Sequence, residues 1–215
     1  MRVIALPVKS LAEAKSRLDP VLSPLERGAL TLAMLEDVMD ATLAIPGWST
    51  WVISPDEAVL EIGLRRGAHA IEEETPPLAS AVRQLEEEAI ATGAEVLAVL
   101  LADTPLVTGR ALTRALHTLG PVVLAPSGDE SGTNLLVRRP PAVIRARFGS
   151  DSYRKHLQGA AEIGVPTSVV DLPELAFDLD LPGDILTVLD GAVRGRTLEV
   201  CREMDLRSRL AARTI

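Results

Sequence analysis

The strongest constraint on this chain is a regular alternation of short apolar runs with longer segments of helical periodicity. The apolar runs are expected as strands and lie at Val3 to Pro7, Thr50 to Ile53, Val96 to Leu101, Val122 to Ala125 and Ser168 to Val170. The helical patterns lie between them, at Pro24 to Leu43, Asp56 to Arg66, Leu78 to Ala91, Gly109 to Thr118 and Asp151 to Ala161. This order predicts an α/β fold with a mostly parallel central sheet and helices on both faces.

Local signals refine the pattern. Ser23 is followed by Pro24 and then by Glu26, a capping-box arrangement that predicts a helix starting at Pro24. Val96 to Ala102 is apolar throughout, as expected for a central strand covered on both faces. The segment from Asn134 to Arg139 is expected as an extra strand, for which antiparallel pairing is an option.

No internal repeat or low-complexity linker divides the chain, so one domain is expected over residues 1–215. After Asp184 the pattern predicts a closing helix and then a long C-terminal helix rich in Arg and Leu. This helical extension, at about 191–215, would either pack back on the domain or support a homodimer.

Composition limits the partners. The 22 basic and 30 acidic residues leave a formal net charge of -8, and aromatic residues make up only 2%, which argues against a nucleic-acid partner. Cys201 has no second cysteine to pair with, and Met1 to Pro7 is too short for a membrane span, so a cytoplasmic protein is expected. Positive charge is nevertheless concentrated at the segments 9–27 and 145–155, which suits a small anionic ligand.

Asp103 directly follows the most apolar run and precedes Thr104 and Pro105. A carboxylate at the end of a parallel strand faces the crevice in which α/β proteins bind ligands. The alternative is an ordinary strand-to-helix turn, in which Asp and Pro are both common. Taken alone, Asp103 supports both interpretations.

Asp178 and Asp180 form a second acidic feature. In an extended segment their side chains point to the same face. Two carboxylates about 4 Å apart would repel by roughly 4 kcal/mol at an effective dielectric near 20. Such a pair favours a cation, and oxygen ligands beside phosphate select Mg²⁺. The alternative is that Asp180 caps a helix beginning near Pro182 while Asp178 lies in solvent.

The segment from Lys9 to Leu18 follows the first expected strand. It contains no Walker A sequence, and no G-x-G-x-x-G sequence occurs in the chain, so Walker ATPases and Rossmann dehydrogenases are disfavoured. Lys15 and Arg17 could neutralise a triphosphate at the edge of the sheet. A solvated basic helix face is the alternative.

Two further segments combine glycine with small hydroxyl residues: SGTN at 131–134 and RFGSDS at 147–152. Backbone N–H groups in such segments can approach an anion closely, although the same residues are common in loops and helix caps. The three histidines, His69, His117 and His156, have no metal-ligand spacing and are interpreted as structural or surface residues.

Together these segments resemble the phosphoenolpyruvate and 2-phospho-L-lactate guanylyltransferases of coenzyme F420 biosynthesis. The similarity runs from Ile4 to about Leu186 and depends on six segments in order: 8–18, 53–56, 102–106, 131–134, 147–152 and 177–180. The resemblance implies an α/β fold similar to nucleotide-diphospho-sugar transferases. Two positions depart from the family pattern: Ala102 stands where a glycine is usual, and Leu78 to Ser80 where an asparagine is usual.

The resemblance also implies roles for individual residues. Thr133, Gly149 and Ser152 would bind the phosphorylated acid. Asp103, Asp178 and Asp180 would hold Mg²⁺, so Asp103 would be catalytic together with Lys15 and Arg17. The nucleotide-binding set would be Lys9, Lys15, Arg17 and Ser80.

The implied function is transfer of GMP from GTP to phosphoenolpyruvate or 2-phospho-L-lactate, with release of pyrophosphate. The choice among these acids and 3-phosphoglycerate stays open. One alternative is a nucleotidyltransferase of the same fold that uses CTP, ATP or another phosphorylated substrate. The other is a nucleotide-binding domain without catalytic activity.

Overall fold

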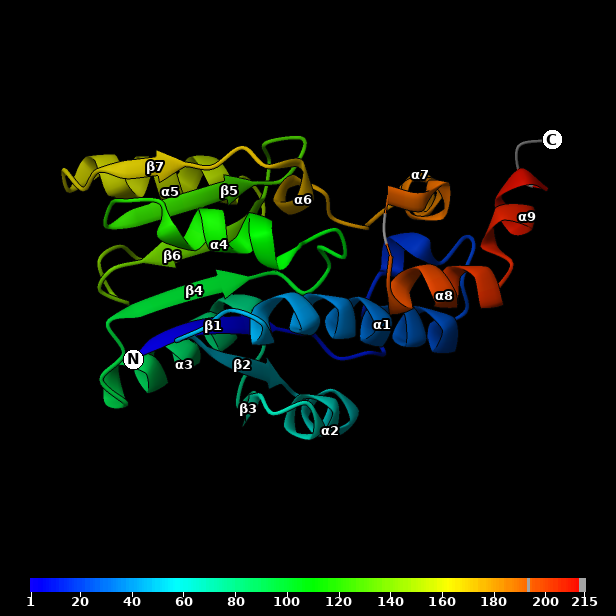
Figure 1. The fold of residues 1–215 in the computed structure, drawn as a ribbon, viewed down its shortest axis with the longest axis horizontal. Coiled ribbons are helices and arrows are strands. Elements are labelled where there is room, and N and C mark those ends of the chain that lie inside the picture. The colour runs from blue at the N-terminus through cyan, green and yellow to red at the C-terminus, as the bar shows by residue number, and fades with distance from the viewer. Residues whose placement is uncertain (193, 213–215) are drawn as a thin grey trace.

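The structure is a computed structural model that describes residues 1–192 and 194–212. Its centre is a seven-stranded sheet with the order β3-β2-β1-β4-β6-β5-β7 (Figure 1). The strands are β1 (Arg2–Pro7), β2 (Ser49–Ser54), β3 (His69–Glu72), β4 (Val96–Leu100), β5 (Val122–Pro126), β6 (Thr133–Arg138) and β7 (Thr167–Val169). The helices that flank the sheet are α1 (Pro24–Leu43), α2 (Glu57–Arg65), α3 (Leu78–Ala91), α4 (Gly109–His117) and α5 (Ser152–Glu162).

The sheet is mostly parallel. β1 pairs in parallel with β2 and β4, β3 joins β2, and β7 joins β5. β6 lies between β4 and β5 and is antiparallel to both. The structure therefore confirms the expected fold class and shows that the extra strand is antiparallel. The edge strand β3 was not predicted, because its end residues His69 and Glu72 are exposed, the two between them are only half-buried, and the strand merges with an acidic run.

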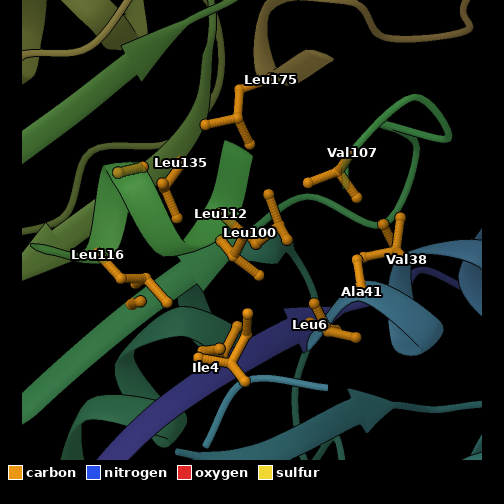
Figure 2. Packing of buried hydrophobic residues seen from close by; sticks show 14 of the residues in the cluster. Ile4, Leu6, Val38, Ala41, Leu100, Val107, Leu112, Leu116, Leu135 and Leu175 are labelled. Atoms are coloured by element: carbon orange, nitrogen blue, oxygen red, sulfur yellow. The ribbon is translucent and has the colours of Figure 1, made fainter. Parts of the chain in front are cut away.

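Helices cover both faces of the sheet, because alternate residues of a strand point to opposite sides. Ile4 and Leu6 of β1 pack with α1 and α4, as Figure 2 shows for Val38 and Leu112. The opposite face of β1, with Val3 and Ala5, packs against α3. α5 covers the same opposite face farther along the sheet, over β5 and β6.

The long helix α1 begins where the capping box predicts. The Ser23 side chain accepts from the Glu26 N–H, and the Glu26 carboxylate accepts from the Ser23 N–H at 2.9 Å. Pro24 occupies the first helical position, where its missing N–H costs no hydrogen bond. Leu30 and Met34 are fully buried. Figure 1 shows that the helix extends past the sheet, and the buried side chains of its first half pack against the C-terminal segment.

The C-terminal segment is a set of short helices beside this first half of α1 (Figure 1). They are α7 (Pro182–Thr187), the π-helical turn η2 (Val188–Ala192), α8 (Arg196–Glu203) and α9 (Leu206–Ala211), and a 3₁₀ turn η1 (Ser16–Leu18) joins the same cluster. The short helix α6 (Pro173–Ala176) precedes them and packs instead against α4, β5 and β6. Asp37 of α1 fixes α8, since its carboxylate accepts from the N–H groups of Arg196 at 2.7 Å and Thr197 at 2.9 Å.

The prediction of one long C-terminal helix is wrong. The chain turns at Asp205, whose φ of 48° is left-handed and interrupts the helix between α8 and α9. Residues 193 and 213–215 of the expected extension lie outside the described residues, and the homodimer stays a prediction. Across the described ranges, no helix combines the length and apolarity needed to cross a membrane.

Candidate active site

A two-armed cleft opens at the carboxyl ends of β1 and β4. One hollow, of about 380 Å³, is lined by residues 7–9 and 13–17 with Thr31 and Met34, and we call it the loop arm. The other, of about 730 Å³, is lined by residues of 127–134, 148–152 and 173–184, and we call it the strand arm. The two arms share Lys9, Arg17, Leu78, Leu101, Asp103 and Asp180, and so form one continuous cleft.

Lys15 lies where the arms meet. Its Nζ is 2.7 Å from Asp103 Oδ2 and 2.6 Å from Asp180 Oδ1, and its side chain is only 8% exposed. Burial alone would lower the pKa of Lys15, but the charges of Asp103 and Asp180 outweigh burial and raise it above its usual value. Lys15 is therefore a protonated ammonium group between carboxylates from distant parts of the chain.

Asp178 lies in the same acidic group. The Asn134 Nδ2 donates to Asp178 Oδ1 at 3.3 Å and to the carbonyl oxygen of Leu175 at 2.9 Å, which ties the segment after α6 to β6. Burial, with the nearby charge of Asp103, raises the pKa of Asp178 to about 6. Negative charge at this point of the cleft is thus only partly balanced by Lys15.

The donor set fits a hard divalent cation. Asp103 Oδ1 is buried without a hydrogen-bond partner, and burial and the charge of Asp103 outweigh the opposing charge of Lys15 in raising the pKa of Asp178. Carboxylate oxygens are the ligands that Mg²⁺ prefers. Among the described residues, no group of three or more Asp, Glu, His or Cys side chains is arranged to hold a metal ion. The ammonium group of Lys15 lies between two of the carboxylates, Asp103 and Asp180. The assignment of Mg²⁺ to Asp103, Asp178 and Asp180 stays a prediction.

The strand arm brings together Thr133, Gly149 and Ser152, three residues that the sequence placed in one subsite. Thr133 begins β6 and Ser152 begins α5, and the Ser152 Oγ lies 3.3 Å from Thr133 Oγ1. Gly149 has a φ of 115°, a backbone conformation that side chains rarely adopt. Hydroxyl groups and a helix N-terminus therefore face the same hollow.

One residue of this arm, Asp129, and one residue behind it, His156, make contacts that sequence reasoning missed. Asp129 shapes the loop before Thr133, since its carboxylate accepts from Ser127 Oγ at 2.6 Å and from the Ser131 N–H at 3.0 Å. The first of these bonds contributes most to lowering the pKa of Asp129 to about 2. His156 is fully buried and contacts Thr133. A histidine four residues after Ser152 on one helix face was the available signal for it.

Of the remaining predicted nucleotide-binding residues, Arg17 and Lys9 line the cleft and Ser80 does not. Arg17 is 70% exposed and lies 3.4 Å from Asp180 Oδ2. Lys9 lines both arms. Ser80 lies on α3 and lines a separate hollow with Glu74 and Arg83. The geometry therefore gives no support to a role for Ser80, which stays a prediction.

The fold defines the class of protein. The structure superposes on a Desulfovibrio desulfuricans G20 protein named as a nucleotide-diphospho-sugar transferase, with a TM-score of 0.76, 19% identity, and coverage of 99% of this chain and 98% of the other. A nucleotidyl transferase from Methanothermobacter superposes as well, with a TM-score of 0.66, 18% identity, and coverage of 89% of this chain and 97% of the other. The fold is thus the α/β fold of nucleotidyltransferases and nucleotide-diphospho-sugar transferases, as the family resemblance implies.

The sequence defines the family within that class. Residues 1–208 match the family model described as guanylyl transferase CofC like, and the chain belongs to this family. A phosphoenolpyruvate guanylyltransferase of Rubrobacter xylanophilus is 40% identical, covering 86% of this chain and 92% of the relative. A 3-phospho-D-glycerate guanylyltransferase of Phenylobacterium zucineum is 33% identical, covering 96% and 97%. A 2-phospho-L-lactate guanylyltransferase of Haloarcula marismortui is 37% identical, covering 88% and 87%.

Proposed function

We propose that this chain is a magnesium-dependent guanylyltransferase that transfers GMP from GTP to a phosphorylated three-carbon acid and releases pyrophosphate. The observation that carries the proposal is the two-armed cleft, whose arms meet at Asp103 and Asp180. A transfer between two substrates requires their reacting atoms to be held next to each other, and two connected hollows suit that task. The names of the relatives supply the two substrate classes.

Phosphoenolpyruvate is the acid we place first, with a role in coenzyme F420 biosynthesis. The Rubrobacter xylanophilus relative carries that acid in its name, whereas other relatives are named for 3-phospho-D-glycerate and 2-phospho-L-lactate. All three acids combine a phosphate with a carboxylate. The hydroxyl groups of Thr133 and Ser152 line the arm in which we place this acid.

The proposed reaction is an in-line displacement at the α-phosphorus of GTP. A phosphate oxygen of the acid forms a bond to that phosphorus, the bond from it to the oxygen bridging the β-phosphate breaks, and pyrophosphate leaves with the electron pair. The acid's phosphate is already ionised at neutral pH, so no general base is required. Catalysis then consists of positioning and charge neutralisation.

The residues divide this work by position. Lys15 and Arg17, at the junction of the arms, neutralise the phosphates of the nucleotide. Thr133, Gly149 and Ser152 hold the acid in the strand arm. Asp103, Asp178 and Asp180 would hold Mg²⁺, which when bound supplies further neutralisation of the phosphate charge.

A pyrophosphate-release assay tests the proposal. We expect release with GTP and at least one of the three acids, and much less when ATP or CTP replaces GTP. Release with CTP or ATP in place of GTP would favour a different nucleotidyltransferase. GTP binding without release, whichever acid is supplied, would favour a domain that binds nucleotide without catalysis.

A further inference from the structure

His156 makes two hydrogen bonds inside the protein, one at each ring nitrogen. The backbone N–H of Arg147 donates to Nε2 at 2.8 Å, and Nδ1 lies 3.0 Å from the Thr133 hydroxyl oxygen. The ring is fully buried and meets the Phe148 ring edge-on, with the centroids 5.3 Å apart. His156 is thus an enclosed side chain whose only described polar contacts are these two.

These contacts determine which ring nitrogen carries the proton. A backbone N–H can only donate, so Nε2 must accept and cannot carry a hydrogen. The ring is therefore neutral, with its hydrogen on Nδ1, and Nδ1 donates to Thr133. Burial, followed by the charges of Arg138 and Arg147, lowers the pKa of His156 to about 4, which agrees with a neutral ring.

The donor at Nδ1 in turn determines what the hydroxyl groups can do. Thr133 Oγ1 accepts from His156 and lies 3.3 Å from Ser152 Oγ. If Ser152 donates to Thr133, the proton of Thr133 is left over. If Thr133 donates to Ser152, the proton of Ser152 is left over. In both arrangements one hydroxyl proton remains for the strand arm, which both residues line.

We infer that His156 is a positioning residue that makes the Thr133–Ser152 pair a hydrogen-bond donor toward an anionic oxygen of the phosphorylated acid. A histidine of the opposite tautomer would accept the Thr133 proton and remove this donor from the cleft. The inference rests on the proposed function for the identity of the ligand. It gives a functional role to His156, which the sequence analysis interprets only as a structural or surface residue.

Two amide variants separate the two hydrogen bonds. His156→Asn retains an amide N–H near the position of Nδ1, where it can donate to Thr133. His156→Gln retains an amide oxygen near the position of Nε2, where it can accept from the Arg147 N–H, and leaves Thr133 without its donor. Each variant loses the imidazole ring and one of its two hydrogen bonds, and the Asn side chain is one methylene group shorter than the Gln side chain.

The test is the equilibrium binding of phosphoenolpyruvate and of GTP to the full chain. We expect His156→Gln to bind phosphoenolpyruvate about tenfold more weakly than His156→Asn, with equal affinity for GTP. In a Thr133→Val background the difference between the two variants should vanish. Equal phosphoenolpyruvate affinity in both variants, or a difference that persists without the Thr133 hydroxyl, would overturn the inference.

A second test uses the wild-type protein and so does not depend on whether a variant folds. The ¹⁵N chemical shifts of the His156 ring should show hydrogen on Nδ1, and hydrogen on Nε2 would overturn the inference. Measuring pyrophosphate release distinguishes a failure of the positioning role from a failure of the proposed function. A wild-type chain that binds phosphoenolpyruvate but releases no pyrophosphate contradicts the enzyme, whereas normal turnover with identical Asn and Gln variants contradicts only the positioning role.

Discussion

The backbone N–H of Leu179 donates to the carbonyl oxygen of Asp103 at 3.0 Å. This hydrogen bond joins the turn after β4 to the segment between α6 and α7. Because Leu179 lies between Asp178 and Asp180, both carboxylates are held beside Asp103 by main-chain atoms. Removing the charge of one carboxylate therefore leaves the framework of the acidic group in place.

Replacing Asp103 tests whether this framework serves catalysis. Asp103→Asn preserves the backbone hydrogen bond and the size of the side chain, but it removes a charge from the junction of the two arms. We expect kcat for pyrophosphate release to fall by about 100-fold or more, with a cooperative melting transition retained. The matched control is Asp171→Asn, at an exposed aspartate outside the cleft, which should keep wild-type turnover. Near-normal activity of Asp103→Asn would refute the assignment.

Replacing Lys15 tests competition between an ammonium group and a divalent cation. In Lys15→Met the carboxylates of Asp103 and Asp180 lose the charge that lies between them. A metal ion should then bind more tightly, so added Mg²⁺ should raise the melting temperature of Lys15→Met more than that of the wild type. The control is Lys155→Met, at an exposed lysine of α5. Equal shifts in all three proteins would count against a cation site at these carboxylates.

Ser80 and Lys9 give a prediction with opposite outcomes. Lys9 lines both arms of the cleft, whereas Ser80 lines a separate hollow. Lys9→Ala should raise KM for GTP about tenfold, since a charge-assisted contact to phosphate is lost. Ser80→Ala should leave KM for GTP unchanged. Steady-state kinetics with varied GTP concentration measures both KM values. A raised KM for Ser80→Ala would show that Ser80 contributes to nucleotide binding.

The sequence predicts those parts of the fold that depend on local periodicity and capping. The helix from Pro24 to Leu43 has its predicted bounds, because Ser23 and Glu26 cap it and a buried face follows. The edge strand β3 was missed, because partial burial leaves it no apolar run. The break at Asp205 was missed too, because a left-handed residue other than glycine has no reliable sequence signal.

The candidate site likewise has a part that could be predicted from the sequence and a part that could not. Carboxylates that follow strands could be expected in one crevice, since the carboxyl ends of parallel strands share an edge of the sheet. The position of Lys15 between Asp103 and Asp180 could not, because it depends on how a loop with a φ of 51° at that residue folds back. The role of His156 also required coordinates, since only the Arg147 N–H fixes its tautomer.

The raised pKa of Asp178 makes stability depend on pH in a defined direction. Its pKa rises from 3.8 to about 6 in the folded protein, chiefly through burial. Between these values the folded state binds more protons than the unfolded state, so the free energy of unfolding falls as pH rises. Above about pH 6 the full cost of the buried charge is present. The charge of Asp178 therefore lowers the free energy of unfolding of the wild type at neutral pH, and protonation in acid removes this destabilisation.

Asp178→Asn should remove that penalty, because the new amide carries no charge and its oxygen can still accept from the Asn134 side chain. With a chelator present, the variant should be more stable than the wild type by about 1–2 kcal/mol near pH 8, and the gain should shrink near pH 4. Denaturant unfolding at both pH values measures it, with Asp171→Asn as the control expected to show little change. The chelator matters because a bound cation would favour the charged carboxylate and reverse the sign. A gain that stays constant across the pH range would show that the charge of Asp178 is not its cause.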